Sequence, residues 1–279
     1  MTDSNSSNNS EASSAVSGLA LSLALVITCT AAFGESQFDR DSALALSQAA
    51  LGRSLPAVTF TDTSGHQVNL AGYQGKPLVI SMIYTSCHHI CPMTTRHLQA
   101  VVAKARDALG VDSFHVISIG FDTLKDSPPM MARFAEAQGI DLPGWDFLSG
   151  TQASVDSLSD TLGFQYFPSA SGFDHLIQVS VIDERGRVYQ QVYGMGFEPP
   201  LLIEPLKRLV YRTHDDDTLL DNLAKQVRLF CTVYDPASDR YRFDYSLFVG
   251  MFIGFLCVGT LGVVLVFEWH KTLAKRGIR

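Results

Sequence analysis

Cys87 and Cys91 are the residues of this chain best suited to chemistry, because the two thiols stand four positions apart in Cys-His-His-Ile-Cys-Pro. The apolar run 77–84 before them predicts a strand, and Pro92 predicts a helix from that residue to about Ala108. Proline disfavours helical dihedrals in the residue before it, which places Cys91 at or just before the helix start. Unpaired backbone N–H groups and the helix dipole there favour thiolate over thiol. Such a pair either binds a soft metal or closes a disulfide.

A metal site with two thiolates needs a further ligand, and histidine is the usual complement. Among the eight histidines His175 is the best placed, since it ends the predicted loop from Pro168 to Asp174 and opens a strand of the same sheet. Asp174 is expected to orient the imidazole or to place charge near the metal. His88 and His89 lie inside the cysteine loop, and neighbouring residues cannot both point inward, so their roles stay open.

Two thiolates and one imidazole form a soft ligand set that suits Cu(I) and also accommodates Cu(II). Structural zinc normally requires four protein ligands, and no second pair of closely spaced cysteines supplies them. The c-type haem motif is absent, because His88 follows the first cysteine rather than the second. Cys231 stands alone and is interpreted as a packed or free thiol rather than a third sulfur ligand.

Strand and helix patterns alternate through the middle of the chain, which predicts an α/β sandwich around a mainly parallel sheet with an antiparallel pair at its end. The predicted strands are 58–61, 66–70, 78–84, 114–120, 145–148, 176–183 and 187–193, and the predicted helices after the cysteine pair are 129–138, 154–162 and 199–212.

Composition limits the classes of partner. The chain has 279 residues and a net charge of -7, which argues against nucleic acid because phosphate binding needs a basic surface. At 46% hydrophobic and 18% charged residues, the chain can form one well-packed domain with additional segments.

Two apolar segments indicate a membrane partner. Residues 245–267 carry no charge and would form a helix about 35 Å long, enough to cross a hydrocarbon core of about 30 Å. Basic residues in the tail 268–279 predict a cytoplasmic C-terminus and therefore a domain on the exported, periplasmic side. The leader 1–36 contains a second apolar stretch, interpreted as a signal peptide or an uncleaved membrane helix, although it lacks a positive first region.

From about Leu55 to Tyr211 the chain resembles the SCO/SenC family. The segments that carry the resemblance occur in the family's order: Gly75-Lys-Pro-Leu-Val-Ile, Tyr84-Thr-Ser-Cys87, Cys91-Pro92, Phe121-Asp-Thr-Leu-Lys-Asp-Ser-Pro128, Asp174-His175 and Asp183-Glu-Arg-Gly186. The resemblance implies a thioredoxin-like fold and a copper site made by Cys87, Cys91 and His175. Family members assist assembly of the binuclear copper centre of cytochrome c oxidase by delivering copper, by reducing its cysteines, or both. The implied partners are a copper-receiving oxidase subunit and another copper carrier or thiol reductant.

The predicted organisation is a leader (1–36), a linker (37–54), a thioredoxin-like copper-binding domain (55–212), a juxtamembrane extension (213–244), a transmembrane helix (245–267) and a basic tail (268–279). Three features depart from the family's commoner pattern. His88-His89 replace Pro-Asp inside the cysteine loop, Leu176 stands where a small polar residue is common, and a membrane helix follows the domain.

Three functions remain in competition. A membrane-tethered copper chaperone requires His175 as well as both cysteines, whereas a thiol-disulfide oxidoreductase without stable metal requires only Cys87 and Cys91. A redox or copper sensor would signal through the C-terminal helix, where Gly250 and Gly254 could form a dimer contact.

Overall fold

The computed structural model describes residues 38–212, 218–235, 238 and 240–276. The predicted leader 1–36, with its signal-peptide or membrane-helix interpretation, lies outside the described residues, and so does the end of the basic tail, 277–279.

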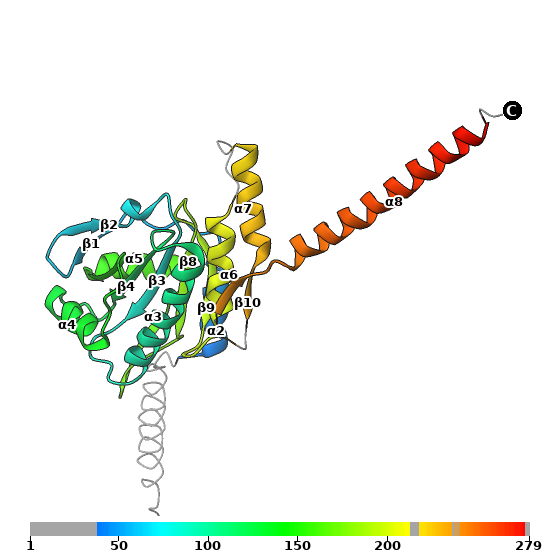
Figure 1. Ribbon diagram of the computed structural model, residues 1–279. Helices are drawn as coiled ribbons and strands as arrows, with labels where there is room; N and C mark the ends of the chain where they lie inside the picture. The colour runs from blue at the N-terminus through cyan, green and yellow to red at the C-terminus, as the bar shows by residue number, and fades with distance from the viewer. Residues whose placement is uncertain (1–37, 213–217, 236–237, 239, 277–279) are drawn as a thin grey trace, which may run out of the picture.

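A seven-stranded sheet forms the centre of the domain (Figure 1). In spatial order its strands are β2 (Gln67–Asn69), β1 (Thr59–Asp62), β5 (Trp145–Ser149), β4 (His115–Gly120), β3 (Leu78–Ile83), β8 (Gln178–Ile182) and β9 (Val188–Tyr193). Every residue of β3 is buried, as its continuous apolar pattern predicts for a central strand. The prediction of an α/β fold with a terminal antiparallel pair is confirmed.

The prediction of a mainly parallel sheet is wrong. Only the pairings of β3 with β4 and of β4 with β5 are parallel. The pairings of β1 with β2, β1 with β5, β3 with β8 and β8 with β9 are antiparallel. The short connections from β1 to β2 and from β8 to β9 leave no room for the long crossover that a parallel pair needs. The pairings of β1 with β5 and of β3 with β8 are antiparallel although long stretches of chain separate the two strands.

Helices cover the sheet, and three of them pack together: α3 (Ile90–Leu109) lies against α4 (Pro128–Gln138) and α6 (Pro199–Val210). The other two helices of the domain are α2 (Arg40–Gln48) and α5 (Gln152–Leu162). Within the predicted linker, α2 buries Ala43 and Ser47, and the Ser47 hydroxyl lies 2.8 Å from the Tyr193 hydroxyl.

Helix α3 begins two residues earlier than predicted, so Cys91 lies inside its first turn rather than before it. Pro92 occupies the third helical position, where the missing N–H has no partner within the helix in any case. The proline therefore marks the helix start only to within one turn.

The predicted loop before His175 is instead a hairpin of β6 (Tyr166–Ser169) and β7 (Gly172–His175). Gly172 has a φ of 126°, a conformation that side chains with a Cβ rarely adopt. Pro168 hides the strand from sequence analysis, because proline usually argues against one unless the strand is at an edge.

In its described residues, the predicted juxtamembrane extension packs on the domain rather than forming a simple spacer. It comprises α7 (Leu219–Cys231) and a hairpin of β10 (Thr232–Asp235) and β11 (Arg240–Phe243), which packs beside α3. The buried Lys207 ammonium of α6 donates to the Thr232 carbonyl oxygen at 2.6 Å, and this bond ties the hairpin to the domain.

Helix α8 (Ser246–Arg276) follows the hairpin and projects away from the domain (Figure 1). Its segment Phe248–Trp269 has 22 residues with a mean hydropathy of 2.5 and is not buried by the rest of the protein. Within the described part of the chain it is the one helix long and apolar enough to cross a membrane. The expected C-terminal apolar helix is confirmed. Its apolar segment begins at Phe248, three residues after the predicted start.

Candidate metal centre

The loop that carries Cys87 follows β3 directly and is held by a buried carboxylate. Asp126, only 2% exposed, accepts hydrogen bonds from the Thr85 backbone N–H and hydroxyl through Oδ1, both at 2.7 Å. Its Oδ2 accepts from the Asp122 N–H at 2.9 Å. Burial raises the pKa of Asp126, although these hydrogen bonds oppose the shift. Asp126 thus joins the loop after β4 to the cysteine loop, a role that its place in the sequence did not indicate.

Cys87 accepts a hydrogen bond on its sulfur from the Cys91 backbone N–H at 3.3 Å. Burial acts to raise the pKa of the Cys87 thiol, but hydrogen bonds from the N–H groups of Cys91 and His89 and from the Tyr84 hydroxyl outweigh it, so that this pKa lies below its ordinary value. The expectation that the helix start favours a thiolate therefore holds for Cys87. Burial, followed by the bond to Cys87, raises the pKa of Tyr84 to about 12.

For Cys91 the same expectation is wrong. This side chain is 3% exposed, and burial raises the pKa of its thiol far above the ordinary value. The nearby charges of Cys87 and Asp126 add to the upward shift. Loss of hydration dominates here, because the sulfur lies within the core and its burial outweighs a hydrogen bond from the Tyr84 backbone that acts to lower the pKa.

His175 ends β7 with its imidazole among aromatic rings. Its ring centroid lies 5.4 Å from that of Phe121 and 5.3 Å from that of Phe164. Nδ1 lies 2.7 Å from the Leu176 carbonyl oxygen, which can only accept, so Nδ1 carries the proton and Nε2 keeps its lone pair. Burial lowers the pKa of His175, which favours the neutral ligand form. The Leu176 carbonyl, rather than the exposed Asp174, orients this ring.

Cys91 and His175 line one narrow cavity of about 20 Å³. A single water needs about 10–15 Å³ by the same kind of measure, so the cavity has the size of one small ion. Gln178 lines it too, and the Gln178 Oε1 atom is buried without a hydrogen-bond partner among the described residues. An enclosed space with a thiol, an imidazole and an unsatisfied polar atom fits a bound metal.

Cys87 does not line that cavity but a separate open groove, which shares no lining residue with it. No three histidine, cysteine or acidic side chains within the described ranges lie close enough to enclose a metal ion. The structure therefore brings Cys91 together with His175 and Cys87 together with Cys91, but it does not gather all three sulfur and nitrogen atoms around one point.

The remaining candidates lie outside the cavity. His88 and His89 are both exposed, and only His88 lines the open groove. Cys231 is a buried free thiol at the end of α7, in agreement with its interpretation as a packed residue.

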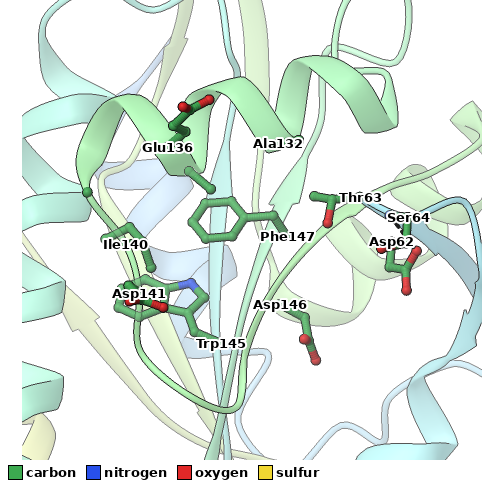
Figure 2. Close-up of a pocket in the computed structure, with 12 residues that line it drawn as sticks. Asp62, Thr63, Ser64, Ala132, Glu136, Ile140, Asp141, Trp145, Asp146 and Phe147 are labelled. Atoms are coloured by element: carbon green, nitrogen blue, oxygen red, sulfur yellow. Dashed lines mark hydrogen bonds between the residues drawn. The ribbon is translucent and has the colours of Figure 1, made fainter.

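A larger hollow of about 630 Å³ lies beneath α4 and beside β5 (Figure 2). Asp62, Glu136, Asp141 and Asp146 surround it, and Phe147 and Trp145 form its apolar part. No cysteine or histidine lines this hollow. It therefore offers no soft ligand, and its greater volume does not make it the metal site.

The SCO1/SenC family profile matches residues 52–211, which are 160 of the 279 residues of the chain. The chain belongs to the SCO1/SenC family. The SCO1 protein homolog of Bacillus subtilis is 26% identical over 145 residues, covering 50% of this chain and 74% of that protein.

Solved structures agree with the family's thioredoxin-like fold. A protein of Aquifex aeolicus, described as a candidate electron transfer protein, superposes with a TM-score of 0.54 at 29% identity, covering 61% of this chain and 99% of that one. BsSco, described as a member of the Sco family of cytochrome c oxidase assembly proteins with a disulfide switch, superposes with a TM-score of 0.53 at 22% identity, covering 58% and 96%. The predicted family and thioredoxin-like fold are confirmed.

Proposed function

We propose that this SCO1/SenC protein is a membrane-anchored copper-binding chaperone that assists assembly of the copper centre of cytochrome c oxidase. The observation that carries the proposal is the narrow cavity lined by both Cys91 and His175, with the Cys87 sulfur hydrogen-bonded to the Cys91 N–H. The Sco family is described as one of cytochrome c oxidase assembly proteins, which supports cytochrome c oxidase as the recipient of the copper.

Copper would be held by the sulfurs of Cys87 and Cys91 and by Nε2 of His175. A rotation of the Cys87 side chain towards the cavity would complete the set, because its sulfur already contacts the Cys91 backbone. Two thiolates and a neutral imidazole suit Cu(I) and tolerate Cu(II). The crystal structure of yeast Sco1, another member of the family by name, holds copper.

The C-terminal helix supports a membrane location for the proposed chaperone. Phe248–Trp269 would anchor the chain in the membrane, and Lys271, Lys275 and Arg276 after it favour a cytoplasmic tail. The domain would then lie on the exported side, where a copper-receiving oxidase subunit and another copper carrier or thiol reductant could reach it. A reporter fused after Arg279 should report cytoplasm, and one inserted near Arg212 the exported side. The reverse result would remove the oxidase-assembly role.

A thiol-disulfide oxidoreductase is the second candidate, and one observation favours it. Cys87 is a hydrogen-bonded thiol with a lowered pKa, followed by a buried Cys91 with a raised pKa. This asymmetry is typical of an attacking and a resolving cysteine. Such an enzyme would need both thiols but not His175.

Metal content of the purified full-length protein separates the two functions. The chaperone predicts one copper per reduced wild-type chain and a clear loss in His175→Ala, whose fold is checked by circular dichroism. The oxidoreductase predicts no stable copper in either protein, with equal disulfide reductase rates. A His175→Ala protein with full copper content would exclude His175 as a ligand.

A further inference from the structure

The two cysteines line two hollows of different character. The inner cavity of about 20 Å³ is lined by Cys91 and His175. The outer groove, of about 260 Å³, is lined by Cys87 and runs between the start of α3 and helix α4. The Cys87 sulfur thus contacts the Cys91 N–H and also lines the groove, although the residue is only 9% exposed.

Two further soft ligands line the outer groove beside Cys87. They are the exposed imidazole of His88 and the thioether of Met130, which is 37% exposed. The Met130 sulfur accepts a contact from the Arg133 guanidinium at 3.8 Å, which a bound copper would replace. Met130 belongs to the first turn of α4, which opens with two prolines that fix its start. Thiolate, imidazole and thioether together are ligands that Cu(I) accepts.

The inner cavity is poorly accessible to another molecule. Cys91 is almost completely buried, and the rings of Tyr84, Phe121 and Phe164 surround the His175 imidazole. Of the three proposed ligands, Cys87 is the one that lines the open groove, so a partner at the groove would reach the copper through this sulfur.

We propose that Cys87, His88 and Met130 form a hand-over site through which Cu(I) enters and leaves the inner site. The inference rests on the proposed copper-binding function and adds a transfer step to it. The bond between copper and the Cys87 sulfur is kept throughout. The bonds to the Cys91 sulfur and to His175 break, Cys91 leaves as a thiolate, and bonds to a His88 nitrogen and to the Met130 sulfur form. Copper stays Cu(I), so no oxidant or reductant takes part.

The proposal gives His88 a role that separates it from its neighbour. His89 is also exposed, but it does not line the groove. His89→Asn is therefore a matched control for His88→Asn, with the same chemical change one residue away. Met130→Leu removes the thioether with little change in side-chain volume.

The test measures two properties of the full-length, Cu(I)-loaded protein in detergent, with the chromophoric Cu(I) chelator bathocuproine disulfonate as the acceptor. The first is equilibrium affinity by competition, which the inner ligands set. The second is the rate of copper removal. The double variant of His88→Asn and Met130→Leu should keep wild-type affinity and lose copper about tenfold more slowly, with each single variant in between and His89→Asn at the wild-type rate.

The outcomes distinguish failure of the hand-over site from failure of the proposed function. A wild-type protein without copper would remove the function, and the hand-over site with it. Copper-binding protein whose double variant releases copper at the wild-type rate would overturn the hand-over site alone. So would an equal slowing in His89→Asn, or a loss of affinity in the double variant as large as in His175→Ala.

A direct structural readout is available in His175→Ala, where the weakened inner site should shift copper outward. X-ray absorption of this variant, labelled with selenomethionine and loaded with Cu(I), should show selenium bound to copper. The signal should vanish when Met130→Leu is added. Absence of a copper–selenium contact in the labelled His175→Ala protein would contradict a thioether ligand at this groove.

Discussion

Cys87 and Cys91 lie on one short segment, yet their surroundings differ sharply. The Cys87 sulfur accepts hydrogen bonds from backbone N–H groups and borders an open groove, whereas the Cys91 sulfur is enclosed by the core beside His175. The pKa of the first thiol is lowered and that of the second is raised. Proximity to a helix start does not by itself make a thiolate, because burial reverses its effect within one turn.

The difference assigns the two sulfurs to different tasks. A hydrogen-bonded thiolate that lines an open groove is suited to exchange with a partner, while a sulfur beside an imidazole in a closed cavity is suited to retention.

The largest effect is expected from oxidation of the pair. On an ideal helix, residues four apart hold their Cβ atoms about 5–6 Å apart, while a disulfide needs about 3.5–4.5 Å. Because Cys87 lies in the loop before α3, a small backbone movement closes this gap. A Cys87–Cys91 disulfide leaves no thiolate, so oxidised protein should take up no tightly bound copper until it is reduced. Copper uptake and free thiols counted in parallel test this, and tight uptake by protein with the bond intact would refute the shared use of the sulfurs.

Removal of a single sulfur should have the next largest effect. Cys87→Ser or Cys91→Ser should weaken Cu(I) binding by about 100-fold or more, since a hydroxyl is a poor ligand for a soft ion. Cys231→Ser is the matched control, because Cys231 is also a buried free thiol but lines neither hollow. A loss of affinity in Cys231→Ser comparable to that in Cys91→Ser would place the site elsewhere.

The contrast in pKa should appear as different alkylation profiles. Since the pKa of Cys87 is lowered, its thiolate persists to lower pH, whereas Cys91, with a raised pKa, stays a thiol until more alkaline pH. At pH 7 iodoacetamide should modify Cys87 about tenfold faster than Cys91 or more. Mass spectrometry of the two modified forms measures the rates. Equal rates from pH 6 to 9 would mean that the two environments do not differ as described.

Asp126→Asn should have the smallest effect on copper binding but a measurable effect on stability. The two carboxylate oxygens of Asp126 accept hydrogen bonds from Thr85 and from Asp122, and the substitution replaces one of these oxygens with a donor group. The free energy of unfolding should therefore fall by about 1–3 kcal/mol. Urea unfolding measures this loss. Glu136→Gln, an exposed change on α4, should leave stability unchanged. An Asp126→Asn protein as stable as wild type would show that Asp126 does not hold the cysteine loop.

Sequence reasoning found the elements whose patterns are uninterrupted. The continuous apolar run of β3, the alternation of β1 and β2, and the helices after Pro92 and Pro128 all appear where expected to within a few residues. Strand direction was not predictable, because antiparallel and parallel neighbours share the same apolar pattern when both faces are buried. The β6–β7 hairpin was hidden by Pro168.

The candidate site was predictable only in its residue types. The spacing of Cys87 and Cys91 and the position of His175 were sufficient to select them. Their opposite pKa shifts depend on which sulfur is enclosed by side chains distant in the sequence, and the loop contact of Asp126 spans 41 positions to Thr85. Such effects come from tertiary packing and leave no local pattern.

X-ray absorption at the copper edge of reduced, copper-loaded wild-type protein tests the central claim most directly. With Cys87, Cys91 and His175 as ligands, the spectrum should show two sulfur scatterers and one imidazole nitrogen per copper. The imidazole should disappear in His175→Ala, while both sulfurs remain. A wild-type spectrum with fewer than two sulfurs, or a His175→Ala spectrum that keeps the imidazole with the same ligand count, would contradict the proposed site.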